Sequence, residues 1–432
     1  MSAKINTNAS DQSYWSIVKR QFKKNRVAVW SLRVVYVIIF IGIMADFLAN
    51  EKPIYCKLDG QSYFPIFNSY GVDLGIAKYP QAFINLDWQN APFESVIRTP
   101  IPYSPRNMDL KNKDYKSPFD EQDVQSTRWH HFMGTDNLGR DVLAGMIHGT
   151  RTAMLVGIIS MSISVVIGIF FGALAGYYGD KGMQMSRARF WLSIIFGILG
   201  LYYAFGLRSY HISTALSESI PQFLIQILLS ILIFITFFGL GNVLANLLKK
   251  NNFLGQKVDV PVDIIISRLI EIKVSIPTLL LILSIVAVMK SPSILLVMVI
   301  IGFTSWTGIA KYTRAELLKV RSLEYIQAAQ SLGYSEWRTI FKHALPNSLS
   351  SVLVAVAFGV AGAILLESSL SFLGIGVKPE DVTWGSMLSG ARGYFKAWWL
   401  AIFPGMAIFI TVTIFNLLGE GLTDAMDPRL KK

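Results

Sequence analysis

Cysteine is nearly absent from this sequence. Its 432 residues contain only Cys56, so no disulfide can form within the chain and folding does not depend on an oxidising compartment. Charged residues are also scarce, at 16%, whereas apolar residues reach 52%. A soluble globular chain of this length carries more charge and fewer apolar residues. The composition excludes an ordinary soluble globule and predicts an integral membrane protein with several spans and an extramembrane part.

Acidic residues are fewer than basic ones, 28 against 40, which gives a formal charge of +12. Nucleic-acid binding would need a basic face with stacking aromatic residues. Here the positive residues instead flank apolar segments, the positive-inside pattern of membrane proteins. We therefore expect no nucleic-acid partner and place both termini in the cytoplasm. The flanking residues are Lys19, Arg20, Lys23, Lys24 and Arg26 before the first span, and Arg429, Lys431 and Lys432 after the last.

Motifs for cofactors and metals are missing as well. No glycine-rich segment continues into the Gly-Lys-Ser/Thr of a phosphate-binding loop, so we expect no nucleotide site in this chain. The pair His130-His131 lies near Asp136 and Asp141, but without the spacing that is typical of a zinc site. A turn that leads into a span is the better interpretation. We predict no metal and no other cofactor.

Long apolar runs predict the fold class: an all-α polytopic membrane protein with six core spans and two inserted ones. The predicted segments are a cytoplasmic interfacial lead (1–26), a first span (27–49), an extracytoplasmic insertion (50–140), a second core span (141–180), an inserted pair of spans (181–260) and the remaining core spans (261–432). The core spans are expected at about Val27–Ala49, Arg151–Tyr178, Ile264–Val288, Ile294–Tyr312, Leu345–Phe372 and Trp398–Leu418. Gly157, Gly168, Gly172 and Gly176 predict close helix packing in the second core span.

The two insertions differ in character. Residues 50–140 are rich in proline, asparagine and aspartate, which predicts irregular or short-stranded structure. Residues 181–260 contain two apolar runs, about Phe190–Leu207 and Phe223–Leu248, with basic residues on both outer flanks. Two added spans would leave the topology of the rest unchanged and keep those basic residues inside. The alternative is an interfacial hairpin that never crosses the membrane, since the first run is near the minimum spanning length.

A polar, helix-forming stretch, residues 324–333, lies between two apolar segments. Ser322 can cap its start, and Glu324 occupies the first turn, where the helix dipole favours an anion. Gly333 can supply the left-handed residue that ends the helix. Ala328 and Ala329 keep one surface low enough for a partner's groove to reach the backbone. Pro346 suits the first turn of the next span.

This stretch resembles the EAA loop of ABC importer permeases, whose consensus is Glu-Ala-Ala, three residues, Gly, nine residues, Ile-x-Leu-Pro. Ala328, Ala329, Gly333, Leu345 and Pro346 match, whereas Gln327 and His343 replace the Glu and Ile of the consensus. Further segments resemble the C-type permease of dipeptide, oligopeptide and nickel importers. They are residues 133–142, 306–316, 366–374, 383–388, 403–406, 416–422 and 424–430.

The resemblance implies a type I ABC importer transmembrane domain in a bacterial inner membrane. It implies as partners a second, homologous permease, two cytoplasmic ATPase subunits, an extracytoplasmic solute-binding protein and membrane lipid. The chain would then be a non-catalytic subunit that forms half of a pore for peptides or peptide-like solutes. The loop 321–346 would transmit the ATPase movement through Glu324, Gln327, Ala328, Ala329, Gly333, Leu345 and Pro346.

One ionisable residue within a predicted span is a candidate functional residue. Glu367 lies in an apolar segment with Ser368 and Ser371, and a charge at such depth is costly unless it is paired or faces water. These three residues could line the translocation pathway, or they could form interhelical hydrogen bonds that only orient packing. Two other functions stay open: a self-sufficient secondary transporter and an intramembrane metal enzyme. The first would need a deep ion-coupling site and the second paired ligands within spans; neither is visible.

Overall fold

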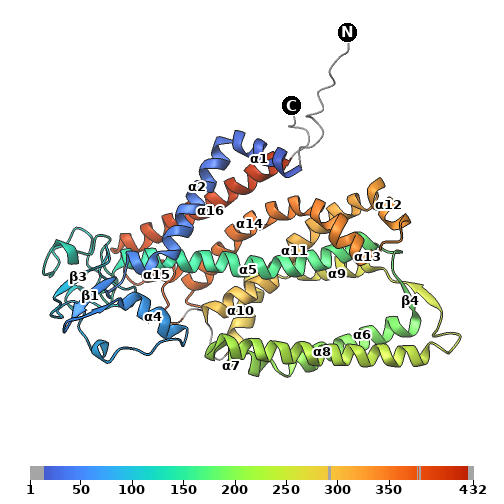
Figure 1. Ribbon diagram of the computed structural model, residues 1–432, viewed down its shortest axis with the longest axis horizontal. Coiled ribbons are helices and arrows are strands. Elements are labelled where there is room, and N and C mark those ends of the chain that lie inside the picture. The colour runs from blue at the N-terminus through green and yellow to red at the C-terminus, as the bar shows by residue number, and fades with distance from the viewer. Residues whose placement is uncertain (1–13, 290–292, 377, 379–380, 427–432) are drawn as a thin grey trace, which may run out of the picture. The chain divides into compact units, whose positions relative to one another are not determined.

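The structure is a computed structural model that describes residues 14–289, 293–376, 378 and 381–426. Its long elements are helices (Figure 1), and the chain divides into two compact units. The first unit contains the chain up to Ile158 and again from Ala357, and the second contains Ile159–Val356. Residues 1–13 of the predicted lead, and Arg429, Lys431 and Lys432, lie outside the described residues.

In the first unit, the helices α2 and α16 pack closely because Ala28 of α2 faces Gly421 of α16. Asn25 caps the start of α2: its side-chain oxygen accepts a hydrogen bond from the backbone N–H of Ala28 at 3.1 Å. A side chain at Gly421 would collide with Ala28, so glycine permits the close approach. The helices of this region are α1 (Tyr14–Lys24), α2 (Arg26–Ile43), α3 (Ala45–Leu48), α15 (Trp384–Gly390) and α16 (Trp398–Met426).

The polar segment 50–140 contains short strands, as predicted, and one short helix that was not. The strands form an antiparallel sheet in the order β2-β1-β3, in which Cys56 lies opposite both Tyr63 and Val96. Cys56 is buried in a small core with Phe83 and Trp88. The elements are β1 (Tyr55–Leu58), β2 (Gln61–Tyr63), α4 (Pro65–Asp73) and β3 (Ser95–Ile97), with single turns at Gln81–Phe83, Leu110–Asn112 and Thr127–Trp129.

The helix α5 (Val142–Tyr178) contributes to both units and begins nine residues before the predicted span. In the second unit its glycines Gly168, Gly172 and Gly176 lie against α11 (Ile294–Val320), where any side chain would collide. Hydroxyl groups secure the same contact: Ser160 Oγ donates to the carbonyl of Met298 and Ser164 Oγ to that of Gly302, both at 2.8 Å. The predicted small-residue packing is confirmed at these positions.

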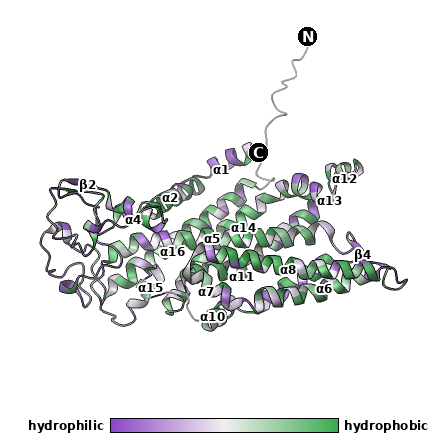
Figure 2. Ribbon diagram, turned by 60° about the horizontal axis from the view of Figure 1, so that its bottom comes forward, coloured by the Kyte–Doolittle hydropathy of each residue, from purple (hydrophilic) through white to green (hydrophobic). Residues whose placement is uncertain are grey.

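The inserted segment forms an antiparallel pair of helices, α6 and α8, that lie side by side (Figures 1 and 2). Figure 2 colours α8 predominantly hydrophobic. Both predicted apolar runs are helical, but the polar link between them is helical too, which was not predicted. That these helices cross the membrane stays a prediction. The elements are β4 (Gln184–Ser186), α6 (Arg187–Leu201), a π-turn (Tyr202–Gly206), α7 (Ser209–Glu218), α8 (Ile220–Leu248) and β5 (Lys257–Asp259).

The span predicted at about 264–288 is broken into two helices that meet at 79°, and that the pair crosses the membrane as one span stays a prediction. The helix α9 (Val262–Ser275) ends before Pro277, and α10 (Thr278–Val288) begins after it. Proline lacks a backbone N–H and forces the residue before it out of the helical region, so Ile276 is extended with ψ at 122°. Among the described residues seven helices could cross a membrane, and this bent pair would make eight.

Candidate functional site

The loop 321–346 joins α11 to α14 (Leu345–Phe372) through a short helix, α12 (Glu324–Ser331). Glu324 occupies the first turn as predicted, but the predicted Ser322 cap is wrong. Ser322 Oγ donates to the carbonyl of Lys319 at 2.8 Å, so the hydroxyl satisfies the end of α11 rather than the start of α12. The N-cap position of α12 belongs to Leu323, which offers no side-chain cap.

Gly333 ends α12 in the left-handed conformation, with φ at +77°, as predicted. The N–H of Gly333 bonds the carbonyl of Gln330, and the N–H of Tyr334 bonds that of Ala329. These two bonds define a Schellman motif, which satisfies carbonyls at the end of the helix. A Cβ at position 333 would meet nothing within 4 Å, so the requirement for glycine here is conformational and not steric.

The two alanines of α12 face opposite ways. Ala329 is buried at 5% exposure, and Ile326 beside it is fully buried. Ala328 and Gln327 are exposed. Of the two alanines, only Ala328 therefore presents a low surface to the outside, whereas Ala329 holds the helix against the protein's own core.

Leu345 and Pro346 lie in the first turn of α14, as predicted for Pro346, and a π-turn precedes them directly. The short helix α13 (Glu336–Arg338) leads into a π-turn, Thr339–Ala344, and on into α14. In the π-turn the N–H of Leu345 reaches the carbonyl of Ile340, five residues back. Proline at position 346 cannot donate a helical hydrogen bond, and a local π-turn is one way a helix accommodates that loss. Leu345 is buried, and Pro346 is exposed.

Glu367 lies deep within the first unit, at 2% exposure in α14. Its carboxylate accepts hydrogen bonds from Ser371 Oγ at 2.5 Å and Ser368 Oγ at 3.4 Å, and it also bonds Thr383. A side chain at Gly385 would collide with the backbone of Ser368, so the start of α15 packs directly on this cluster. Ser368 and Ser371 lie in the same helix as Glu367, so Thr383 is the partner that links Glu367 to the start of α15. Thr383, which also caps α15, is a partner that the sequence did not single out.

A cavity of about 380 Å³ lies next to this cluster in the first unit. Ser371 lines it but Glu367 does not. Part of the wall comes from three of the segments that carry the family resemblance, through residues that include Arg140, Ser371, Ser386 and Met387. Arg140 Nε donates to the carboxylate of Asp136 at 2.6 Å, so its charge is balanced at the cavity wall.

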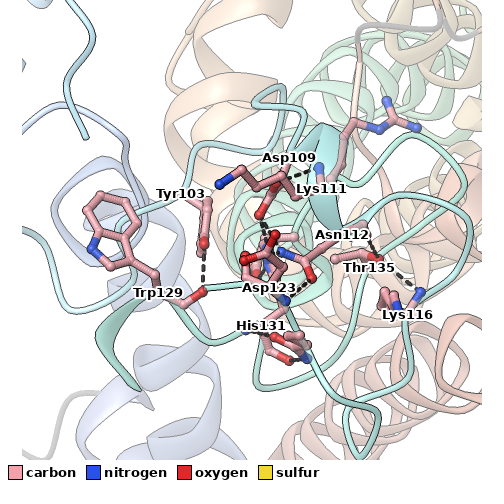
Figure 3. A network of polar contacts seen from close by, with 12 residues as sticks. Tyr103, Asp109, Lys111, Asn112, Lys116, Asp123, Trp129, His131 and Thr135 are labelled. Carbon is pink, nitrogen blue, oxygen red and sulfur yellow. Dashed lines mark hydrogen bonds and ion pairs between the residues drawn. The ribbon is translucent and has the colours of Figure 1, made fainter. Parts of the chain in front are cut away.

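His131 is the centre of a closed polar network before α5 (Figure 3). Its ring is fully buried, with Nδ1 2.8 Å from Asp141 Oδ2 and Nε2 3.3 Å from Asp109 Oδ2. The ring stacks on Tyr103 at a centroid distance of 4.3 Å. Burial raises the pKa of the Tyr103 phenol, and the nearby charges of Asp109 and Asp141 add to this. Because Asp109 lies 22 residues away, no local spacing pointed to it.

The four residues of the metal interpretation do not form one ligand set. Asp136 turns to its own loop, where it accepts hydrogen bonds from the N–H groups of Leu138 and Arg140. Asp141 Oδ1 accepts from the N–H of Ala144 and so supports the start of α5. In the described part of the chain no group of three or more His, Cys, Asp or Glu residues is arranged to hold a metal ion. This geometry is that of the predicted turn leading into a span.

Similarity to known proteins agrees with this architecture. Residues 253–432 match the family described as "Binding-protein-dependent transport system inner membrane component", and residues 13–65 match "N-terminal TM domain of oligopeptide transport permease C". A glutathione transport system permease protein of Pectobacterium atrosepticum is 30% identical over 302 residues, which cover 70% of this chain and 73% of the relative.

Two further relatives match almost end to end. A peptidoglycan transport system permease protein of Agrobacterium fabrum is 27% identical across 95% of this chain and 92% of its own. An inner membrane ABC transporter permease protein of Escherichia coli is 26% identical across 97% of both.

Fold and similarity together define a polytopic, mostly helical transmembrane subunit of a type I ABC importer. The chain belongs to the family of binding-protein-dependent transport system inner membrane components. It is a multi-pass, non-catalytic permease subunit, and in this family the hydrolysis of ATP belongs to partner subunits.

Proposed function

We propose that this permease subunit imports peptides or peptide-like solutes and receives the ATPase movement through the loop 321–346. The observation that carries the proposal is the shape of α12, a short helix closed by the Gly333 Schellman motif that presents Gln327 and Ala328 outward. Large apolar side chains beside it are also exposed, among them Leu332 at 74% and Trp337 at 52%. Exposed apolar residues that surround an ordered polar helix are typical of a docking surface.

The proposal places both termini and this loop in the cytoplasm, and the segment 50–140 outside. Partners are a second permease, a pair of ATPases and a solute-binding protein. Peptide cargo is supported by the names of similar proteins, which are called transport permeases for glutathione, di- and tripeptides, and peptidoglycan. Nucleotide and the loaded binding protein must bind one state of the pore more tightly than the other, since equal affinity for both states would shift nothing.

Reconstitution tests this function. The chain is assembled with its partner subunits in vesicles, and uptake of labelled short peptides is measured with the binding protein and ATP. We expect uptake only when ATP, the ATPases and the binding protein are all present. Uptake by the chain alone along an ion gradient would instead support the secondary transporter.

The sheet in the segment 50–140 is the proposed docking site for the solute-binding protein. Its ends lie together, because the N–H of Ile54 bonds the carbonyl of Ile97 at 2.8 Å. Residues 55–96 can therefore be replaced by a short Gly-Ser linker without removing Tyr103, Asp109 or His131. We expect the shortened chain to assemble with the ATPases but to lose the stimulation of ATP hydrolysis by binding protein. Full stimulation would exclude the docking role.

A further inference from the structure

Two adjacent tyrosines end α5, and each hydrogen-bonds a different arm of the loop 321–346. Tyr177 Oη accepts a hydrogen bond from Gln330 Nε2 at 3.0 Å, and Gln330 lies in α12. Tyr178 hydrogen-bonds Glu336, which begins α13. The Gly333 turn lies between these two loop residues. The end of α5 is thus attached on both sides of the turn.

The same tyrosines belong to the apolar core beneath the loop. Their rings are both 8% exposed and meet edge to face at 5.5 Å, with an interplanar angle of 87°. They pack in one cluster with Ile326 of α12 and Ile340 of the π-turn, as well as with Leu317 of α11. Burial of these apolar groups holds the loop to α5 but does not fix its register, because hydrophobic attraction is non-directional.

Hydrogen bonds supply the missing direction, since they weaken steeply when their geometry is lost. A third hydrogen bond joins those of the two tyrosine hydroxyls. Arg321 Nη1, at the end of α11, donates to the carbonyl of Tyr177 at 3.2 Å. Both tyrosines line a cavity of about 510 Å³ together with Gln330 and Arg321, so the attachment has room to move.

We propose that Tyr177 and Tyr178 form a two-point latch through which α5 follows the loop when the ATPases move it. The latch rests on the proposed coupling function. In it the apolar cluster keeps α12 and α13 in contact with α5, while the two hydroxyl groups set their register. Tyr177 and Tyr178 are positioning residues, because they act through the loop and touch neither nucleotide nor solute.

The test uses the full assembled transporter and four single variants. Each of the two hydrogen bonds is removed in two ways, by changing one partner or the other. Tyr177→Phe and Gln330→Leu remove the first bond, and Tyr178→Phe and Glu336→Leu remove the second. The phenylalanines keep the buried ring. Gln330 is exposed, so Gln330→Leu leaves the core intact. This variant therefore still tests the first bond when Tyr177→Phe lowers membrane abundance. Tyr312→Phe, at a half-exposed ring of α11, is the matched control.

Uptake per ATP hydrolysed is measured beside recovery of the ATPases and membrane abundance. We expect uptake per ATP to fall about three- to tenfold in each latch variant, the effect of losing one hydrogen bond, with ATPase recovery unchanged. Tyr177→Phe combined with Gln330→Leu should cost no more than either alone, because both remove the same bond. Glu336→Gln keeps an acceptor for Tyr178 and should restore most of the uptake lost in Glu336→Leu.

Unchanged uptake per ATP in Gln330→Leu and Tyr178→Phe would overturn the latch. Additive losses in the double variant, or a loss of ATPase recovery that matches the loss of uptake, would also overturn it and assign the tyrosines a structural role. Failure of the coupling function gives a different result from failure of the latch. If coupling fails, substitutions on the outer face of α12, at Gln327 or Ala328, leave ATPase recovery and uptake normal, whatever the tyrosine variants do.

Discussion

Two polar regions next to spans, the loop 321–346 and the segment 99–141, are built in opposite ways. In the segment 99–141 the polar side chains satisfy one another: His131 is fully buried between Asp109 and Asp141. In α12 the polar face is turned outward, and Gln327 is exposed beside the exposed Leu332. A closed polar network stabilises a single shape, whereas an open polar helix surrounded by apolar residues has surface left for a partner. The difference separates a structural region from a candidate docking region.

Ala329→Asp should have the largest effect, because it places an unpaired carboxylate in the apolar contact beneath α12. An isolated buried charge costs on the order of 3 kcal/mol or more, which corresponds to roughly a hundredfold loss of correctly docked loop. Uptake in the assembled transporter should become undetectable while the subunit stays in the membrane. Ala329→Ser is the matched control, and it should retain most activity. Normal uptake by Ala329→Asp would contradict the inward position of residue 329.

Gly333→Val should be the next most damaging change. A β-branched residue disfavours the left-handed conformation at φ +77°, at a cost of about 1–2 kcal/mol. We expect uptake to fall roughly tenfold. Gly333→Asn should lose less, because asparagine adopts this conformation more readily and no neighbour lies within 4 Å of the new Cβ. Equal losses in the two variants would mean that side-chain size, and not backbone conformation, limits this position.

Acid should loosen the closed network around His131 through the Asp109 carboxyl. Burial raises the pKa of the Asp109 carboxyl, but hydrogen bonds from Asn112, His131 and the N–H of Lys111 outweigh it and hold the pKa below the ordinary 3.8. A depressed carboxyl pKa adds stability above the unfolded value, about 3.9, and this stability is lost as the pH falls through the folded pKa.

Asp109→Asn should therefore lower the thermal unfolding temperature of the detergent-purified subunit at pH 7. It should also flatten the fall of that temperature below about pH 4. Asp120→Asn, an exposed change in the same segment, is the control. An unfolding temperature that falls below pH 4 as steeply in Asp109→Asn as in the unchanged chain would contradict this role.

Glu367→Gln should have the smallest effect. Glu367 contacts Thr383 at the start of α15 and Ser371 within its own helix, and an amide of the same shape keeps most of these contacts. Peptide uptake should stay within about twofold, since a hydrogen bond contributes little net energy when a substitute partner exists. A loss of more than tenfold with normal membrane abundance would return Glu367 to the translocation pathway.

Local chemistry predicted the features that depend on neighbours in the sequence. Apolar runs located the helices, and the position of Gly333 predicted the end of α12. Competition between local partners was harder to predict. Ser322 lies between the end of α11 and the start of α12, and its hydroxyl bonds the end of α11. Averaged hydropathy hid the break at Pro277, although proline itself indicates one.

Contacts between distant parts of the chain could not be predicted from one sequence. Gln330 and Tyr177 are 153 positions apart, and nothing in either local pattern marks them as partners. Only the packing of α5 against α11 brings them together. The inward position of Ala329 is of the same kind, since Ala328 and Ala329 are chemically identical and only the fold distinguishes them.

Ala328→Asp tests the central claim most directly, that the outer face of α12 receives the ATPases. Ala328 is exposed, so the charge disturbs no core contact. The measurement is recovery of the ATPase subunits with the tagged permease, alongside peptide uptake and membrane abundance. The account predicts normal abundance, at least tenfold lower ATPase recovery and a matching loss of uptake. Full ATPase recovery with full uptake would contradict it.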